Sequence, residues 1–464
     1  MIVFNQHVPA STVLLLAIEG IAATLSVYAG AALRFAGDWE MLAQDMGQIL
    51  PKALVFMCFV LLGMAATGLY QAHYQRLSAE SVVARVVTGL GLAAIGLTAT
   101  YFFIPALTQG RGVLFLSLVA AFASITAVRF LSARLLGEDT FRRRTLVIGA
   151  GEVASSILKL RRRSDQRGFK IVAFLPAVGD RVVMDDSRVL HEPIAGILDF
   201  VRAEQIDEIV IAMDDRRRGF PISELLDCKF AGVHVVDLIG FLERESGRIN
   251  VDLMNPSWLV FADGFDQKPS RQIIARAFDL AGSLFLLVLA LPLMLAVAVA
   301  ILLEDGRPVL YMQSRVGLAG KSFQLLKFRS MSKEAESDGE ARWAQPGDTR
   351  ITTVGSWIRR LRFDELPQLF NILRGDMSLV GPRPERPEFV SQLSIQIPYY
   401  QERHCVKPGL TGWAQLYYPY GASEEDALQK LCYDLYYVKN HSFLLDLVIL
   451  LQTAEVVIWR KGSR

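Results

Sequence analysis

The sequence predicts a membrane protein built of four transmembrane helices, a Rossmann-like α/β domain with a parallel sheet, and a mainly α C-terminal domain. A proline-kinked, re-entrant membrane helix is expected to anchor this last domain. Three observations predict the class. Four apolar runs open the chain, a strand–helix alternation follows, and a proline-interrupted apolar run precedes a charged, aromatic last third. A chain of 464 residues can hold two or three domains, which we place at 1–137, 138–267 and 268–464.

Composition indicates that membrane-embedded and water-exposed parts occupy separate stretches of the chain. Apolar residues make up 52% of the sequence, and charged residues still make up 21%. The net charge is only +2, so we expect no nucleic-acid partner. The four cysteines form no CxxC pair, and neither a disulfide framework nor a zinc site is indicated.

Each of the four N-terminal apolar runs is close to the ~20 residues that a helix needs to cross a bilayer. They cover approximately Thr12–Leu33, Leu50–Tyr70, Val82–Ile104 and Val113–Leu131. The link after the first run carries acids, Asp38 and Glu40, whereas Arg76 and Arg85 follow the second run and Arg134 follows the fourth. Because basic residues mark the cytoplasmic side, we expect both ends of this bundle to face the cytoplasm.

The segment from about Arg144 to Asp266 is typical of an α/β domain. Its first part, TLVIGAGEVASSILKL, indicates a strand, a glycine turn and a helix. KIVAFLP, EIVIAM and VHVVDLIG are further strands of continuous β-branched character, separated by helical stretches. Such alternation predicts a parallel sheet.

The glycine turn matches G-x-G-x-x-A directly after a strand, a pattern typical of dinucleotide binding. Two features argue against a working cofactor site. The second strand ends without the acid expected for ribose hydroxyls, and no tyrosine lies between Tyr101 and Tyr311, so a Tyr-x-x-x-Lys pair is absent from this segment. We interpret the turn as structural, with Gly149 and Gly151 as weak candidates for cofactor binding and a regulatory nucleotide as the alternative.

The apolar run from Leu280 to Leu303 contains no charged residue and has Pro292 in its middle. Length alone predicts a transmembrane span. However, positive charge flanks both ends, with Arg276 before the run and Arg307 after it, and this disfavours crossing. A proline also removes a backbone donor and bends a helix. We therefore prefer a re-entrant helix over 272–303 that enters and leaves on one face, with a fifth span as the alternative.

Adjacent carboxylates at Asp364 and Glu365 precede an apolar-periodic segment and would lie in the first turn of its helix. An N-cap with a dipole-complementing acid is the commonest use of such residues and is the alternative here. The cations nearby favour chemistry instead; they are Lys327, Arg329, Arg359, Arg360, Arg362, Arg383 and Arg386. Arg383 lies in GPRPERP, whose prolines would hold its fork aimed at a phosphate. Phosphoryl transfer needs a nucleophile, fixed positive charge and a divalent cation, and carboxylates suit Mg²⁺.

Four motifs follow one another in the last part of the chain: KFRSM (Lys327–Met331), DELPQLFNILRGDMSLVGPRP (Asp364–Pro384), KPGLTGWAQ (Lys407–Gln415) and DLYYVKN (Asp434–Asn440). In this order they resemble the bacterial sugar transferases, or polyprenyl-phosphate glycosylphosphotransferases. The resemblance covers about Lys268–Arg464, and the preceding bundle and Rossmann-like domain resemble the long-form members. The stretch Leu416–Asn440 resembles the exopolysaccharide branch found in exosortase-bearing bacteria.

The resemblance implies a reaction. A UDP-hexose donates its sugar 1-phosphate to undecaprenyl phosphate. The sequence does not specify the sugar, and the family suggests glucose or galactose. UMP leaves and a polyprenyl diphosphate sugar remains, which initiates exopolysaccharide biosynthesis. The family's location implies the bacterial inner (cytoplasmic) membrane, with the catalytic domain on the cytoplasmic face. The oligomeric state stays open, and a homodimer is the arrangement considered.

The resemblance also implies a role for each site residue, carried over by position in the motifs. Asp364 would be the nucleophile that forms an aspartyl–phosphosugar intermediate, and Glu365 with Asp364 would hold Mg²⁺. The substrate phosphate-binding set is Lys327, Arg329, Arg359, Arg383 and the acidic site residue Asp434. The chain departs from the family pattern at Arg362, where a small hydroxyl residue is usual, and at Phe363, where leucine is usual.

Two other functions compete with this one. The first is a membrane-anchored, NAD-dependent nucleotide-sugar dehydratase or epimerase, because such enzymes also join membrane spans to a Rossmann domain. The missing Tyr-x-x-x-Lys pair and the missing ribose acid argue against it. The second is a non-enzymatic scaffold for polysaccharide export, which the intact Asp364–Glu365 pair argues against.

Overall fold

The computed structural model of the chain describes residues 2–3, 6–7, 10–35, 38, 40, 49–70, 79–135, 142–158, 160, 168–178, 180–183, 187–190, 196–217, 219–254, 256–262, 264–265, 269–332, 350–418 and 423–459. These residues form two compact units, Met1–Ser246 and Gly247–Arg464. Arg76, used above to predict topology, lies outside the described residues, as do the predicted domain boundaries at 137–138 and 267–268.

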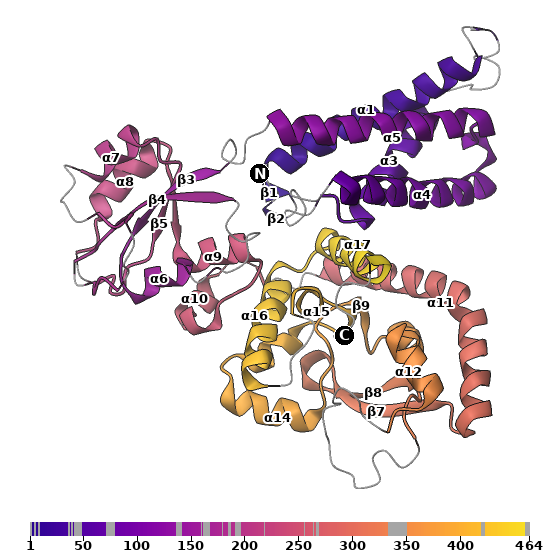
Figure 1. Cartoon of the computed structure of the whole chain (residues 1–464). Coiled ribbons are helices and arrows are strands. Elements are labelled where there is room, and N and C mark those ends of the chain that lie inside the picture. Colours follow the sequence, from indigo (N-terminus) through magenta and orange to yellow (C-terminus); the bar gives the residue numbers. More distant parts are fainter. Residues whose placement is uncertain are drawn as a thin grey trace. The chain divides into compact units, whose positions relative to one another are not determined.

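A helix occupies each of the four apolar runs in the first unit: α1 (Ala10–Phe35), α3 (Ile49–Ala66), α4 (Ala79–Phe103) and α5 (Arg111–Leu135). Each is long and apolar enough to cross a membrane. α1 packs against α5 and α3, and α3 packs against α4 (Figure 1). A Cβ atom at Gly63 would overlap the carbonyl oxygen of Gly89 on the facing helix. Such close backbone approach at small residues is typical of helix packing in membranes.

An ion pair lies inside this bundle. Glu19 of α1 is fully buried, and Arg129 of α5 donates to its carboxylate, with Nη2 3.0 Å from Oε2. The Tyr70 hydroxyl donates to the same Oε2 atom at 2.6 Å, and Arg129 Nη1 donates to the Leu69 carbonyl at 2.8 Å. Ionisable side chains at membrane depth are costly unless they are paired in this way. The pair therefore ties α1 to α5.

Alanine in place of Glu19 should destabilise the bundle, because it leaves the Arg129 guanidinium, whose side chain is only 13% exposed, without its anion. Breaking a buried ion pair by removing one partner costs about 3–5 kcal/mol. The measurement is the thermal unfolding midpoint in detergent. The double variant Glu19→Ala/Arg129→Ala should recover part of the loss, and Thr98→Ala, at an exposed position of α4, should change little. A Glu19→Ala protein as stable as wild type would contradict the assignment.

The α/β domain has the predicted parallel sheet. Its strands are β3 (Arg143–Ile148), β4 (Phe169–Leu175), β5 (Glu208–Ile211) and β6 (His234–Asp237), paired in the order β4-β3-β5-β6 and all parallel. The connecting helices are α6 (Glu152–Leu158), α7 (Ile197–Ala203), α8 (Ile222–Phe230) and α9 (Leu238–Ser246). Figure 1 shows α7 and α8 on one side of the sheet and α6 and α9 on the other. Because the chain crosses back over β3, the order reverses there, as in Rossmann-like folds.

The second unit is mainly α, as predicted. Its helices are α10 (Pro256–Phe261), α11 (Pro269–Asp305), α12 (Thr353–Arg360), α13 (Gln368–Arg374), α14 (Pro387–Gln396), α15 (Trp413–Tyr417), α16 (Glu424–Asn440) and α17 (Phe443–Trp459). Two small sheets interrupt them, an antiparallel pair β7 (Leu310–Val316) with β8 (Ser322–Phe328) and a parallel pair β9 (Ser378–Val380) with β10 (Gly409–Thr411). This unit begins at Gly247, upstream of the domain boundary predicted at position 268. The Gly247 carbonyl accepts a hydrogen bond from Trp413 Nε1 of the same unit.

Helix α11 carries the proline-interrupted apolar run and is 37 residues long, with Pro292 inside it. Figure 1 shows its ribbon bending between the two halves. Near its start, Arg276 donates to the carbonyls of Ile372 and Leu373 at 2.6 and 2.7 Å. Near its end, the Glu304 carboxylate accepts from the first backbone amides of α12. Both ends of α11 are therefore bound to one unit.

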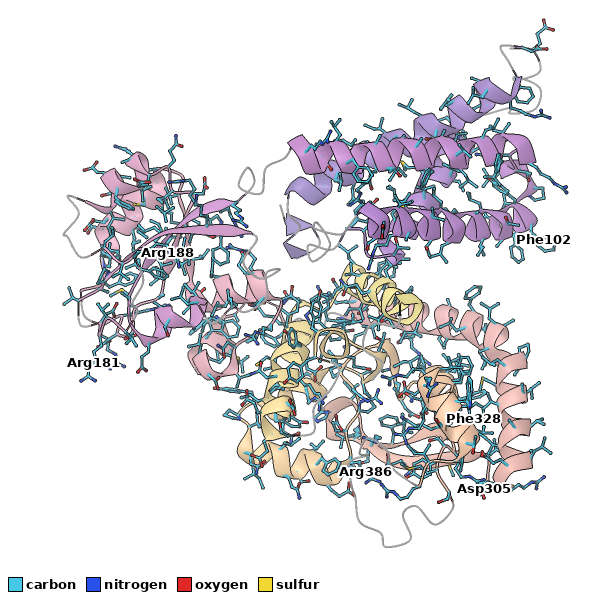
Figure 2. The ribbon with its side chains drawn as sticks, viewed as in Figure 1. Phe102, Arg181, Arg188, Asp305, Phe328 and Arg386 are labelled. Atoms are coloured by element: carbon cyan, nitrogen blue, oxygen red, sulfur yellow. The ribbon has the colours of Figure 1, made fainter. Side chains whose placement is uncertain are left out.

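The second half of α11 packs on the elements that carry the KFRSM motif. Met294, Val297 and Ile301 form a buried cluster with Phe328, which Figure 2 shows between α11 and α12. Asp305, labelled at the end of α11 in the same view, forms an ion pair with Arg329, whose Nη2 lies 3.0 Å from Asp305 Oδ2. These contacts hold the strand β8 and the start of α12 against the apolar helix.

Candidate active site

The carboxylate pair lies in a 3₁₀ turn, Phe363–Glu365, rather than in the first turn of α13 as the sequence predicted. Pro367 occupies the N-cap position of α13, and its side chain accepts no capping hydrogen bond. Asp364 and Glu365 are both buried, at 8% and 9% exposure. Among the residues that the structure describes, neither carboxylate accepts a hydrogen bond from a helix N-terminus. The capping alternative is therefore not the role that the geometry supports.

Arg362 makes the tight bend that enters this turn. Its backbone is left-handed, with φ +60° and ψ +19°, which costs a non-glycine residue roughly 1 kcal/mol. The bend reverses the chain immediately after α12, so that Arg362 Nη1 comes to lie 3.6 Å from Glu365 Oε1. Arg362, which departs from the family pattern, thus places a cation beside Glu365.

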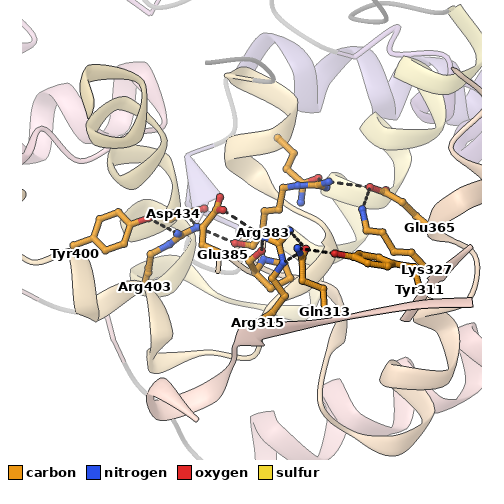
Figure 3. Close-up of polar contacts among 12 residues, drawn as sticks. Tyr311, Gln313, Arg315, Lys327, Glu365, Arg383, Glu385, Tyr400, Arg403 and Asp434 are labelled. Atoms are coloured by element: carbon orange, nitrogen blue, oxygen red, sulfur yellow. Dashed lines mark hydrogen bonds and ion pairs between the residues drawn. The ribbon is translucent and has the colours of Figure 1, made fainter. Parts of the chain in front are cut away.

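Glu365 is neutralised by side chains from three separate segments. Arg383 Nη2 lies 2.9 Å and Lys327 Nζ 3.3 Å from the same Oε1 atom that Arg362 approaches (Figure 3). Burial acts to raise the pKa of Glu365, but the charges of Arg383, Lys327 and Arg362 outweigh it, and the pKa lies well below its usual range. Glu365 is therefore an anion that organises cations.

Asp364 differs from its neighbour. Within the described part of the chain, no side chain pairs with its carboxylate directly. Burial raises the pKa of Asp364, Lys327 partly offsets this, Glu365 adds to it, and Arg359 and Arg362 lower it. A buried carboxylate that is not held by a cation is more basic and more nucleophilic than one in a salt bridge. The geometry thus separates two adjacent acids into one that is paired and one that is available.

Asn371 fixes the strand that supplies Lys327. Its side chain is fully buried, its Oδ1 accepts from the Leu326 amide at 2.9 Å, and its Nδ2 donates to the Gln324 carbonyl at 2.7 Å. It therefore pairs with β8 as a further strand would. Sequence reasoning missed this residue, although an amide inside the apolar stretch LPQLFNILR is a detectable signal, because a buried amide needs partners.

The third motif serves close backbone approach. Strand β10, within KPGLTGWAQ, pairs with β9, which leads into GPRP. A Cβ atom at Gly412 would overlap the Gly381 carbonyl oxygen, and one at Gly381 would overlap the Lys407 carbonyl oxygen. Glycine lets the two backbones meet. The turn that carries Arg383 is thereby seated directly on the third motif.

The remaining predicted phosphate-binding residues lie in different surroundings. Arg359 is half-buried in the last turn of α12, and its charge lowers the pKa of Asp364. Arg329 is buried, and its Nη2 donates to the carbonyls of Asp305 and Gly306. Asp434 of α16 is buried and paired with another arginine. The structure brings Lys327 and Arg383 to the carboxylate pair, and it does not bring Arg329 or Asp434 into contact with it.

The carboxylate pair fits Mg²⁺ by its donor chemistry. The described residues contain no group of three or more His, Cys, Asp or Glu side chains that could hold an ion. Mg²⁺ commonly binds through one or two carboxylates plus substrate phosphates and water, so a protein cage is not required. Asp364 has no competing cation on its oxygens, whereas one oxygen of Glu365 already contacts three. The oxygens that could hold the ion are therefore Oε2 of Glu365 and those of Asp364, because all three cations lie against Glu365 Oε1.

The glycine turn of the α/β domain is occupied by the chain's own carboxylates. Asp214 accepts from the amides of Glu152 and Val153, and Asp180 accepts from the amide of Ala150. A Cβ atom at Gly151 would overlap the Asp214 carboxylate, which shows how closely this anion approaches the turn. In a dinucleotide-binding fold these amides face the pyrophosphate. Here internal anions satisfy them.

We expect NAD⁺ to leave the thermal unfolding midpoint of the wild-type protein unchanged, because the amides that would bind its pyrophosphate already have partners. Asp214→Ala frees two of them and should permit weak binding of NAD⁺ or ADP, measured by calorimetry. Asp215→Ala, which changes the neighbouring acid, is the matched control. Micromolar binding of NAD⁺ by wild type would contradict this prediction and revive the dehydratase alternative.

The chain joins apolar helices to a domain in which buried carboxylates lie among lysine and arginine side chains. This combination is typical of membrane-anchored proteins that handle phosphoanions. Comparison with known proteins identifies the group. The family model described as Bacterial sugar transferase matches residues 270–460. The chain belongs to the bacterial sugar transferase family, as relatives similar over most of their length also show.

Three relatives illustrate the similarity. The UDP-N-acetylgalactosamine-undecaprenyl-phosphate N-acetylgalactosaminephosphotransferase of Aeromonas hydrophila is 40% identical over 278 residues, 60% of this chain and 63% of the relative. The undecaprenyl-phosphate glucose phosphotransferase of Komagataeibacter xylinus is 42% identical over 193 residues, 40% of this chain and 36% of the relative. The UDP-glucose:undecaprenyl-phosphate glucose-1-phosphate transferase of Xanthomonas campestris pv. campestris is 32% identical over 362 residues, 75% of this chain and 73% of the relative.

Proposed function

We propose that this protein transfers a hexose 1-phosphate from a UDP-sugar to undecaprenyl phosphate, giving a polyprenyl diphosphate sugar and UMP, as the initiating step of exopolysaccharide biosynthesis. One observation carries the proposal. Three cations converge on Glu365, while the adjacent Asp364 is buried and unpaired among the described residues. A nucleophile next to fixed positive charge is what phosphoryl transfer requires. The names of the relatives support the substrates.

The reaction proceeds in two displacements at one phosphorus atom. A carboxylate oxygen of Asp364 attacks the phosphorus that bears the sugar, and the bond from that phosphorus to the bridging oxygen breaks, so that UMP leaves with the electron pair. This forms an aspartyl–phosphosugar. A phosphate oxygen of undecaprenyl phosphate then attacks the same phosphorus, the bond to Asp364 breaks, and the free carboxylate returns. Two displacements replace one difficult step by two easier ones.

The surrounding side chains supply charge and orientation. The Arg383 side chain is 41% exposed and that of Lys327 is 21% exposed, so both can meet a substrate as well as Glu365. Fixed cations stabilise the charge on the phosphate oxygens without reorganisation. Mg²⁺, held by Asp364 and Glu365, would neutralise phosphate charge when bound.

The binding of both ends of α11 to one unit supports a re-entrant rather than a spanning helix. A straight helix of 37 residues, rising roughly 1.5 Å per residue, would be longer than the ~30 Å thickness of the hydrocarbon core. The Pro292 position and the contacts of Arg276 and Glu304 instead return the chain to the same domain. Such an anchor would keep the site at the inner-membrane surface, on the cytoplasmic face, where UDP-sugars and the lipid phosphate meet.

The test is UMP release by the purified protein in the presence of Mg²⁺, undecaprenyl phosphate and separately UDP-glucose, UDP-galactose and UDP-N-acetylgalactosamine. The relatives are named for different sugars, so the panel decides the donor. UMP and a lipid-linked sugar phosphate from one donor are expected. Absence of UMP with every donor would overturn the proposal. Size measurement of the same sample in detergent tests the homodimer.

A further inference from the structure

The turn that carries Arg383 is anchored at every carbonyl along its length. The carbonyl of Pro382 accepts from the Gly409 amide at 2.9 Å, and that of Glu385 accepts from the Val316 amide at 2.9 Å. Between them, the Pro384 carbonyl accepts from Arg315 Nη1 at 3.1 Å. The carbonyl of Arg383 itself accepts from Arg403 Nη2 at 3.0 Å. Prolines limit the flanking torsions, so these bonds set where the Arg383 side chain starts.

We propose, building on the function above, that Arg403, held in place by Asp434, is a positioning residue that fixes the main chain of the substrate-binding Arg383. Arg403 is 5% exposed and so does not meet substrate itself. Its Nη1 donates to the Tyr400 hydroxyl at 2.8 Å, while its Nη2 reaches both the Arg383 carbonyl and, at 2.8 Å, Asp434 Oδ2 (Figure 3).

The fork of a guanidinium is needed for this arrangement. Its donors lie in one plane at fixed angles, so a single side chain can bind a hydroxyl, a carbonyl and a carboxylate together. A lysine ammonium is a compact point charge and cannot span the same partners in that plane. Arg403 therefore links α16, which carries Asp434, to the Arg383 turn.

Asp434 acts through Arg403 rather than on a phosphate. Its carboxylate is 2% exposed and lies against the Arg403 guanidinium. A carboxylate in direct contact with a phosphate would repel that phosphate. Burial raises the pKa of Asp434 to about 6, with Arg403 and Lys430 lowering it and Glu385 raising it, so the carboxylate is mainly ionised at neutral pH. We therefore assign Asp434 a different role from the predicted binding of phosphate. It positions Arg403, which in turn positions the main chain of Arg383.

A double-mutant cycle on UMP release tests the relay. Asp434→Asn and Arg403→Lys should each lower kcat/KM for the UDP-sugar roughly 10- to 100-fold, as small misplacements of substrate-binding groups do. In an Arg383→Ala background, Asp434→Asn should cause little further loss, because the group it positions is gone. Multiplicative losses in the double variant would overturn the proposal, as would an unimpaired Asp434→Asn enzyme.

A milder variant and a matched control separate positioning from stability. Tyr400→Phe removes one acceptor of Arg403 and should give a smaller loss of kcat/KM, again absent with Arg383→Ala. Glu208→Gln weakens a comparably buried pair in the α/β domain, where Glu208 Oε1 and Oε2 lie 2.7 Å from the Arg244 guanidinium; it should lower the unfolding midpoint without raising KM. A rise in KM with Glu208→Gln equal to that with Asp434→Asn would overturn the relay.

Binding of UDP, measured by calorimetry, distinguishes the two proposals. If wild type binds UDP but releases no UMP with any donor, the transferase function fails, and the relay is judged on UDP affinity alone. Asp434→Asn should then weaken UDP binding at least several-fold, and not in the Arg383→Ala background. Unchanged UDP affinity would overturn the relay.

Discussion

Asparagine in place of Asp364 should abolish UMP release, lowering the rate roughly a thousand-fold or more, because an amide cannot act as the nucleophile. The substitution nearly preserves volume, and the Asp364 carboxylate has no direct partner among the described residues, so the unfolding midpoint should hardly change. Glu388→Gln, which removes an exposed acid of α14, is the matched control and should retain full activity. An Asp364→Asn enzyme within a few-fold of wild type would refute the assigned nucleophile.

Incubation with the UDP-sugar alone sharpens this test. Without undecaprenyl phosphate, wild type should release about one UMP per protein and retain labelled sugar phosphate, whereas Asp364→Asn should do neither. Glu365→Gln provides the comparison. It should slow the reaction, because Lys327, Arg362 and Arg383 lose their common anion, but it should still permit labelling. Labelling of Asp364→Asn would place the covalent bond elsewhere.

Leucine in place of Asn371 should destabilise the second unit by roughly 3 kcal/mol, because the Leu326 amide and the Gln324 carbonyl would be buried without partners. Activity should fall as well, since β8 supplies Lys327. The measurements are the unfolding midpoint in detergent and UMP release. Gln396→Leu, at an exposed amide of α14, is the control. Unchanged stability of Asn371→Leu would show that the amide does not hold the strand.

Much of the fold could be predicted because its signals are local. Continuous β-branched runs gave the four strands of the α/β domain, and the apolar runs gave α1, α3, α4 and α5. The carboxylate pair and its neighbouring cations were also evident, because unusual charge density shows in the linear order. The 3₁₀ turn at Phe363–Glu365 was not predicted, because it depends on the left-handed backbone of Arg362. That backbone conformation is uncommon for any residue other than glycine, so the sequence does not indicate it.

The residues that sequence reasoning missed make their contacts across long separations. Asn371 is an interior amide of α13, and only its pairing with β8 shows its role. Nothing in the sequence distinguishes Arg403 from the other arginines. Its contacts with the Arg383 carbonyl and the Asp434 carboxylate in the folded protein do. The glycine turn illustrates the converse, because its local pattern is typical of dinucleotide binding, whereas its amides donate to Asp214, far along the chain.

The sequence by itself determined the class of this protein: its membrane helices, its parallel sheet, and four ordered motifs with two adjacent acids among arginines. Only the tertiary structure decided which acid does what. Lys327 from β8, Arg383 from a proline turn and Arg362 from a left-handed bend converge on one oxygen of Glu365 and leave Asp364 free of direct pairing. The physical reason is that a charge acts over a few ångströms in space, and such distances between separate elements are not encoded in spacing along the chain.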